Sequence, residues 1–301
     1  MARDEADSTV VVFGKKIAVK ARDCDKIDIP GRRIEPAVNV FVKITGGCNA
    51  MCPFCSNAGF SGLGRDFDLG KLVNIVRELR IAGVSVNKLN VTGGEPSIVP
   101  DIVGAFLETF SAKEFLDIHL HLNTNAVSSE AHKMIKDLRW DSVSISMHHY
   151  DMDVLSKLYG VGEMVRTVNL SGADLSKVNF SCNLIRGFVD SPEEVHRMLD
   201  FAVDCGVPRI GFVALMKVND YCRDHFIDIN STSMESIPKV HFIESRCRGL
   251  KCKCTNYLYS RGGKMLEVYM RNYADPCYCE SSLVYDGQHL RQGFGDGSVL
   301  V

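Results

Sequence analysis

Three cysteines, Cys48, Cys52 and Cys55, lie close together in the stretch GGCNAMCPFC. Thiolates of this kind ligate zinc and iron–sulfur clusters, and most such sites are closed by four protein ligands. Three neighbouring thiolates leave one position to fill. Either a distant His or Cys completes a zinc site, or a [4Fe–4S] cluster keeps one iron open to the amine and carboxylate of a small molecule.

A second group of cysteines lies near the C-terminus, in CRGLKCKC and DPCYC. Four thiolates are enough for a second cluster or for zinc, and we favour a second [4Fe–4S] cluster. Any surplus thiol would then be free. The five candidate ligands are Cys247, Cys252, Cys254, Cys277 and Cys279.

The bulk composition is that of an ordinary globular protein, with 301 residues, 46% of them hydrophobic, and a formal net charge of -2. No basic tract indicates a nucleic-acid partner, and no apolar run approaches the ~20 residues of a membrane helix. The first ten residues, MARDEADSTV, are polar and do not resemble a signal peptide. We therefore expect a cytoplasmic protein, in which cysteines serve as ligands or reactive thiols rather than as disulfides.

Strand-like and helix-like segments alternate through the middle of the chain, which predicts a parallel sheet with helical crossovers. In residues 68–83, for example, Leu72, Ile75, Val76 and Leu79 recur at helical spacing. The pattern fits an open doubly wound sheet or a full or partial barrel. We expect strands near residues 36–47, 88–94, 116–125, 141–148, 177–185 and 209–216.

The residues that can do chemistry follow the ends of these strands, where parallel sheets gather their functional groups. The cysteine cluster follows the first strand, TGGEP ends the second, NTN with Asn123 ends the third, and SMHH ends the fourth. At least one of His148 and His149 should face the site. We divide the chain into an N-terminal hairpin extension (residues 1–37), a core (38–218) and a Cys-rich C-terminal domain (219–301).

Together, CNAMCPFC, TGGEP and six β/α units resemble the radical S-adenosylmethionine (SAM) superfamily over residues 38–218. The resemblance implies a partial (β/α)6 barrel in which Cys48, Cys52 and Cys55 hold a [4Fe–4S] cluster. SAM would chelate the open iron, and its reductive cleavage would give a 5'-deoxyadenosyl radical that abstracts a hydrogen atom from a substrate. The electron would come from a flavodoxin or a ferredoxin.

The same resemblance implies contacts to SAM for several further residues. Phe54 and Met216 would lie against the adenine, and Ser144 or Ser146 would approach the ribose or the carboxylate. TGGEP would contact the methionine amine. The full set of candidate SAM contacts is Phe54, Gly93, Gly94, Glu95, Asn123, Ser144, Ser146 and Met216.

Two longer stretches, NLIRGFVDSPEEVHRMLDFAVDCGVPRIGFVALMKVN and CYCESSLVYDGQHLRQG, are similar to the GTP 3',8-cyclase branch of molybdenum-cofactor biosynthesis. In that branch the C-terminal extension carries an auxiliary cluster. The branch has arginines just after the cysteine pair, where this chain has residues 280–283 (ESSL), and a basic residue where Asn90 stands. Guanidinium groups match phosphate best, so we expect a substrate other than GTP.

A ribosomal peptide or a small metabolite is the expected substrate, undergoing dehydrogenation, cross-linking, cyclisation or epimerisation. For an epimerisation, Cys182 or Cys222 could return a hydrogen atom to the substrate radical. Two alternatives stay open: a nucleotide cyclase of the cofactor-biosynthesis type, and a non-catalytic zinc or iron–sulfur binding protein.

Overall fold

The computed structural model describes residues 8–19, 37–57, 67–161, 170–245, 254–271, 282–293 and 298–301. Within these residues eleven strands form one sheet, and its centre consists of six parallel strands in chain order. This confirms the α/β class and the six predicted strands. The central strands are β3 (Ala37–Thr45), β4 (Ser85–Gly93), β5 (His119–Thr124), β6 (Ser142–Ser146), β7 (Val178–Leu184) and β8 (Arg209–Ala214).

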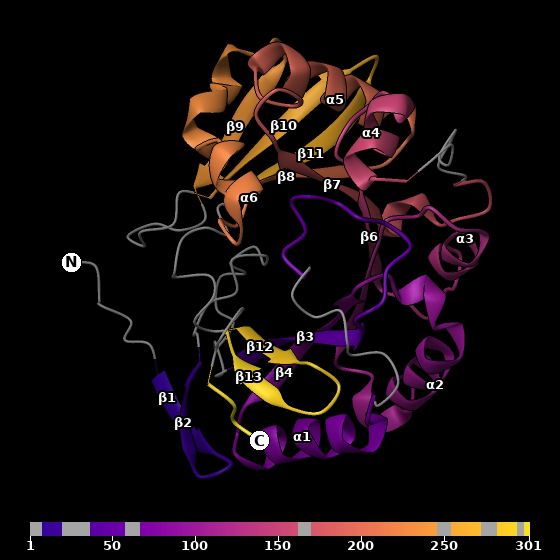
Figure 1. The fold of residues 1–301 in the computed structure, drawn as a ribbon, viewed down its shortest axis with the longest axis vertical. Helices are drawn as coiled ribbons and strands as arrows, with labels where there is room; N and C mark the ends of the chain where they lie inside the picture. The colour runs from indigo at the N-terminus through magenta and orange to yellow at the C-terminus, as the bar shows by residue number, and fades with distance from the viewer. Residues whose placement is uncertain are drawn as a thin grey trace.

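The central sheet curves into an arc, and helices cover its outer face (Figure 1). The α-helices are α1 (Leu69–Ile81), α2 (Pro100–Phe110), α3 (Ser129–Ile135), α4 (Met152–Tyr159), α5 (Pro192–Asp204) and α6 (Asp220–Asp224). Short 3-10 turns are η2 (Pro96–Ile98), η3 (Lys113–Phe115), η4 (Leu175–Lys177), η5 (Ile229–Thr232) and η6 (Met234–Ser236).

The helix ends follow the capping residues in the sequence. Asp68 accepts a hydrogen bond from the Lys71 amide at the start of α1. Ser191 accepts one from the Glu194 amide at the start of α5, which begins with Pro192. These side chains satisfy backbone donors that the first helical turn leaves unpaired. The four apolar residues predicted for the inner face of α1 are all buried.

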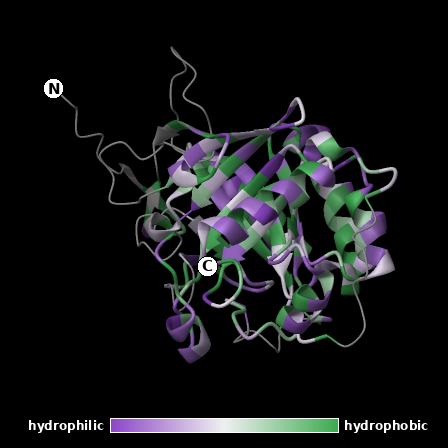
Figure 2. Cartoon of the chain, turned by 90° about the horizontal axis from the view of Figure 1, so that it is seen from above, coloured by the Kyte–Doolittle hydropathy of each residue, from purple (hydrophilic) through white to green (hydrophobic). Residues whose placement is uncertain are grey.

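Each central strand has one apolar face and one polar face, because successive side chains point to opposite sides of a sheet. On β7, Val178, Phe180, Cys182 and Leu184 are buried, whereas Asn179, Ser181 and Asn183 are half-buried on the other face. Figure 2 shows hydrophobic and hydrophilic residues interleaved along the elements. The apolar face packs under the helices, and the polar face points into the interior.

The C-terminal strands extend this sheet at both of its edges (Figure 1). Strand β11 (Lys264–Arg271) pairs parallel with β8 and is followed outward by β10 (Thr255–Arg261) and β9 (Val240–Ser245). At the other edge β12 (Ser282–Tyr285) pairs parallel with β3, and β13 (Leu290–Gln292) pairs with β12. The strands that follow the predicted domain boundary at residue 218 thus belong to the same sheet as the core.

The N-terminal hairpin predicted from the sequence consists of β1 (Ser8–Val12) and β2 (Lys15–Val19). Its turn uses positive backbone φ angles at Phe13 and Gly14. Among the described residues, no helix is both long and apolar enough to cross a membrane.

Candidate functional site

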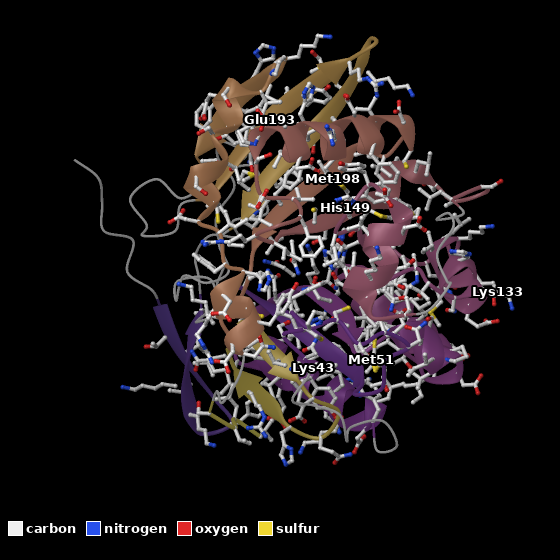
Figure 3. The ribbon with its side chains drawn as sticks, turned by 45° about the horizontal axis from the view of Figure 1, so that its top comes forward. Lys43, Met51, Lys133, His149, Glu193 and Met198 are labelled. Carbon is white, nitrogen blue, oxygen red and sulfur yellow. The ribbon has the colours of Figure 1, made fainter. Side chains whose placement is uncertain are left out.

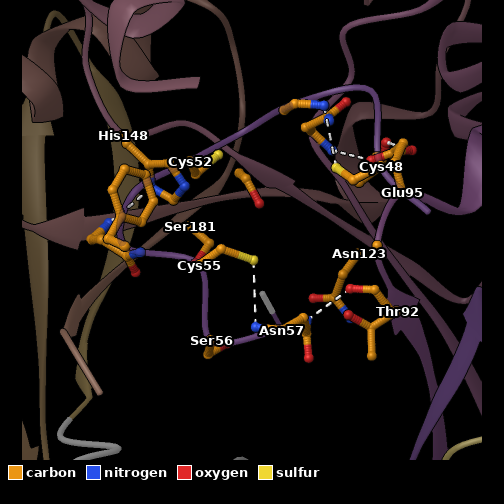
Figure 4. Close-up of a pocket in the computed structure, with 18 of the residues that line it drawn as sticks. Cys48, Cys52, Cys55, Ser56, Asn57, Thr92, Glu95, Asn123, His148 and Ser181 are labelled. Carbon is orange, nitrogen blue, oxygen red and sulfur yellow. Dashed lines mark hydrogen bonds between the residues drawn. The ribbon is translucent and has the colours of Figure 1, made fainter. Parts of the chain in front are cut away.

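A cavity of about 280 Å³ opens at the C-terminal ends of the six central strands. The three clustered cysteines contribute to its lining (Figure 4). Residues from every central strand line it as well. Its uncharged polar lining includes Thr92, Asn123, Ser146, Ser181 and Asn183. The structure therefore brings the predicted cysteine cluster and the strand ends into one site.

Backbone amides help to shape the cysteine loop. The Ala50 amide donates to Cys48 Sγ at 3.4 Å, and the Asn57 amide donates to Cys55 Sγ at 3.4 Å. The bond to Cys48 favours the thiolate form, which is the form that ligates metals. The Met51 amide donates to the Tyr159 carbonyl at 2.7 Å, and this bond ties the loop to the end of α4.

The three sulfurs suit an iron–sulfur cluster or zinc by their chemistry, because both prefer thiolate ligands. Burial raises the pKa of the Cys48 thiol and raises that of Cys52 to about 12. A positively charged metal centre would reverse this effect, since metal binding deprotonates a coordinating thiol. Among the described residues no three His, Cys, Asp or Glu side chains converge closely enough to ligate one ion, so the thiols would have to turn toward a common centre.

The TGGEP glycines bring β4 against the cysteine loop at very close range. The Gly94 amide donates to the Thr45 carbonyl at 2.7 Å, and the Glu95 amide donates to the Gly47 carbonyl at 2.8 Å. A Cβ atom at Gly94 would lie 1.6 Å from the Gly47 carbonyl oxygen. Gly93 has a φ of +126°, which side chains rarely adopt. Both positions therefore require glycine.

Glu95 is buried, with 2% of its surface exposed, and its carboxylate accepts three hydrogen bonds. The donors are Thr124 Oγ1 at 2.7 Å, the Asn125 amide at 2.8 Å and the Ser97 amide at 3.1 Å. Burial raises the pKa of this carboxyl group despite these bonds. Glu95 lines the cavity, and it also holds β4 against the turn that follows β5.

Most of the predicted SAM contacts line the cavity: Phe54, Gly93, Gly94, Glu95, Asn123, Ser146 and Met216. Ser144 is not among the lining residues, and its Oγ accepts a hydrogen bond from Asn179 Nδ2 at 2.6 Å deeper in the sheet. Of the two serines named for the ribose or carboxylate, the structure places Ser146 at the cavity.

The two predicted hydrogen-atom donors do not line the cavity. Cys182 is fully buried on the apolar face of β7, whereas its neighbours Ser181 and Asn183 line the cavity from the opposite face. Cys222, on α6, is buried against Phe54 and its apolar neighbours. A hydrogen-atom donor role for either thiol therefore stays a prediction.

Comparison with models of protein families identifies the family to which these motifs belong. Residues 42–228, more than half of the chain, match the family model of the radical SAM superfamily. The chain belongs to the radical SAM superfamily. Membership implies a [4Fe–4S] cluster and SAM as cofactors, in agreement with the cysteine loop and the TGGEP glycines.

Curated relatives place this radical SAM chain near one branch of the superfamily. It is 27% identical over 168 residues to a probable GTP 3',8-cyclase of Archaeoglobus fulgidus, and the match covers 54% of each protein. A probable GTP 3',8-cyclase of Sulfurisphaera tokodaii is 23% identical over 267 residues, covering 84% of this chain and 78% of the relative. The chain spans about half the length of several of the curated relatives that it matches.

Among solved structures, a radical SAM methyltransferase from Sphaerobacter thermophilus superposes with a TM-score of 0.52. The two proteins are 19% identical, and the match covers 88% of this chain and 72% of the methyltransferase. At this identity the likeness concerns the fold, and it agrees with a partial radical SAM barrel.

Sequence reasoning missed Lys43 and left open which of two histidines faces the radical SAM site. Lys43, on β3, lines the cavity with 5% of its surface exposed, and burial lowers its pKa to about 8 (Figure 3). The alternation in NVFVKIT placed Lys43 on the polar face and was a usable signal. His148 lines the cavity, and His149 does not.

Of the five candidate auxiliary ligands, only Cys254 is described, and it is buried with 2% of its surface exposed. The other four, Cys247, Cys252, Cys277 and Cys279, lie outside the described residues. The second cluster therefore stays a prediction.

Proposed function

We propose that this chain is a radical SAM enzyme that abstracts a hydrogen atom from a ribosomal peptide or a small polar metabolite. One observation carries the proposal: the cysteine loop and the TGGEP glycines share a single cavity whose other polar groups are mostly uncharged. Cys48, Cys52 and Cys55 would hold the [4Fe–4S] cluster, and the glycines would leave room for the methionine end of SAM. When both are bound, they supply one-electron cleavage of SAM and hydrogen-atom abstraction.

The protein's own contribution is to hold the reactants together and to exclude water. Asn123 donates to the Val91 carbonyl at 3.3 Å, and the Asn183 amide donates to His148, so these groups are fixed before a ligand arrives. Preorganised polar groups position a substrate without reorganisation. Amides and hydroxyls along the strand ends suit the hydrogen-bonding groups of a peptide or of a hydroxylated metabolite.

The charges in the cavity favour such a substrate over a nucleoside triphosphate. Within the described lining, Lys43 is the one residue that is cationic at neutral pH, because burial keeps His148 neutral. A triphosphate is ordinarily held by several cations, among which arginines are preferred for their paired donors. The names of the curated relatives favour GTP cyclisation as the second candidate.

We further propose a flavodoxin or ferredoxin as electron donor, and an auxiliary cluster held by four of the five C-terminal cysteines. The auxiliary cluster fits a cytoplasmic protein, because cysteine thiols stay reduced in that compartment. Met51, in the cysteine loop, has 79% of its surface exposed and offers an apolar contact to a donor near the cluster.

Anaerobic reconstitution of the wild-type chain and a variant with Cys48, Cys52 and Cys55 all replaced by Ala tests the proposal. We expect roughly seven to eight irons in the wild type, as two [4Fe–4S] clusters require, and 5'-deoxyadenosine after reduction with SAM. The triple variant should lose about four irons and all 5'-deoxyadenosine. Cys205→Ala is the control, because Cys205 ends α5 away from the cavity. Persistence of 5'-deoxyadenosine in the triple variant, or zinc without SAM cleavage, contradicts the proposal.

The GTP alternative is tested with the same preparation. We expect no conversion of GTP by the reduced, SAM-loaded enzyme, and no GTP-dependent change in the rate of 5'-deoxyadenosine formation. Cyclisation of GTP would replace the proposed substrate class and leave the radical SAM assignment intact.

A further inference from the structure

Side chains as well as backbone groups fasten the cysteine loop, residues 46–57, to the elements around it. Asn125, in the turn after β5, donates from Nδ2 to Asn49 Oδ1 at 2.7 Å. Asn219, the N-cap of α6, donates from Nδ2 to the Pro53 carbonyl at 2.9 Å. The two contact points lie on either side of the second cysteine of the loop, so both halves of the loop are held.

The two asparagines share one arrangement, in which the amide oxygen serves the residue's own turn and the amide nitrogen reaches the loop. Asn125 Oδ1 accepts from the Val127 amide at 3.0 Å. Asn219 Oδ1 accepts from the Cys222 amide at 2.8 Å. A backbone N–H can only donate, so each oxygen must face its own turn. Each Nδ2 is therefore directed at the loop, because a flipped amide would leave the N–H of the turn unpaired.

Asn125 also connects the loop to the TGGEP turn. Its backbone amide donates to the Glu95 carboxylate at 2.8 Å, and only 9% of its surface is exposed. The Glu95 amide in turn donates to the Gly47 carbonyl at 2.8 Å. A closed circuit of hydrogen bonds thus joins TGGEP, the turn after β5 and the first half of the loop. Buried bonds that share partners in this way strengthen one another.

Clamps of this kind suit a ligand loop, because the loop must present three sulfurs to one centre. Ordering a free loop costs conformational entropy, which a loop that is already fixed does not lose when the metal binds. Groups that orient the ligands without touching the metal raise metal affinity. A neutral amide does so without adding a charge beside the metal centre, whereas a carboxylate would change the local electrostatics.

We propose that Asn125 and Asn219 are positioning residues that hold the two halves of the cysteine loop in place for the [4Fe–4S] cluster. This inference rests on the proposed function, because it takes the three cysteines as cluster ligands. Neither asparagine ligates the metal, and each acts through the loop residue that it contacts. Retention of the cluster therefore depends on the two Nδ2 donors as well as on the thiolates.

Serine substitutions separate the clamp from the turn. Asn125→Ser and Asn219→Ser keep a side-chain oxygen for the turn or the N-cap and remove the Nδ2 donor. Asn49→Ala removes the acceptor of the first clamp and leaves Asn125 intact. Asn74→Ser is the matched control, because it makes the same chemical change at an exposed position on α1.

Two measurements report on the loop, one without the cluster and one with it. Hydrogen exchange of the metal-free protein follows the backbone amides of residues 46–57, and transfer of iron to excess chelator follows the reconstituted protein. We expect each clamp variant to speed both about fivefold, as loss of one net hydrogen bond allows, and Asn74→Ser to stay within about twofold of the wild type. EPR lines of the reduced cluster should broaden in the clamp variants, since a looser loop allows more cluster geometries. Thermal midpoints should fall by no more than about 4 °C.

A double-mutant cycle links the first clamp to its acceptor. Asn49→Ala combined with Asn125→Ser should exchange amides and lose iron at the rates of either single variant, because both changes remove the same bond. Multiplied effects of about twenty-fivefold would show that the two side chains act separately, and would overturn the clamp. Wild-type behaviour of Asn49→Ala beside a faster Asn125→Ser would also overturn it, because the role of Asn125 would then lie in the cavity.

Iron transfer and EPR lines that match the wild type in both serine variants also contradict the inference. Failure of the proposed function looks different, because the wild-type protein itself would then bind no iron. In that case the hydrogen exchange of the metal-free variants would still report whether the two asparagines hold the loop.

Discussion

Replacing Gly94 by alanine should separate the TGGEP turn from the cysteine loop. The new Cβ would lie 1.6 Å from the Gly47 carbonyl oxygen and 2.4 Å from its carbonyl carbon. Both are backbone atoms, so relief requires moving a strand end or the loop. We expect loss of two hydrogen bonds, from Gly94 to Thr45 and from Glu95 to Gly47, worth about 1 kcal/mol each. With about 1–3 kcal/mol of overpacking, the free energy of unfolding should fall by roughly 3–5 kcal/mol.

Gly104→Ala provides the control for this experiment. Gly104 lies inside α2, and a Cβ there would have no heavy atom within 4 Å. Alanine should stabilise the helix by about 0.5–1 kcal/mol, so the same chemical change should act in opposite directions at the two sites. Denaturant unfolding monitored by circular dichroism measures the difference, and iron content after reconstitution reports on the cysteine loop. An unfolding free energy within about 1 kcal/mol of wild type at Gly94→Ala, with full iron loading, would refute the packing argument.

Two further predictions concern the scaffold. His121 is buried, which holds its pKa well below the usual value, so the unfolded chain binds a proton that the folded chain does not as the pH falls below about 6.5. As the pH falls, His121 should therefore lower the free energy of unfolding of the wild type by up to about 1.4 kcal/mol per pH unit. His121→Asn keeps an acceptor for Ser142 and should lower that slope. Denaturant titrations at pH 7.5 and 5.5 measure the difference. Parallel pH profiles would contradict it. Ser191→Ala removes the N-cap of α5 and should lower the unfolding free energy by about 1 kcal/mol, whereas an unchanged midpoint would show that the cap contributes nothing.

Local patterns in the sequence predicted the elements well, because each element's signal lies within its own residues. The helical spacing in residues 68–83 and the Ser191–Pro192 start of α5 are examples that the structure confirms. The alternation of side chains also indicates which face of a strand is polar. The suggestion that Cys182 returns a hydrogen atom to a substrate did not use this alternation, since Cys182 shares its face with Phe180 and Leu184.

Local patterns of this kind do not predict which strands pair when they lie far apart in the sequence. The local sequences of β11 and β12 do not indicate which distant strand each pairs with, because pairing depends on the edges of the assembled sheet. The same difference between local and long-range information applies to the functional site. The motif at Cys48 and the alternation around Lys43 both lie within the local sequence, whereas the pairing of β12 with β3 does not.

Strands β12 and β11, which pair in parallel with β3 and β8, lie outside the stretch that carries the superfamily motif. The family match stops at residue 228, yet the strands that satisfy the outer backbone groups of β3 and β8 come later in the chain. A chain cut after residue 228 would present two open strand edges to other molecules and would invite intermolecular pairing. The stretch that carries the recognisable motif therefore has both of its strand edges covered by the remainder of the chain.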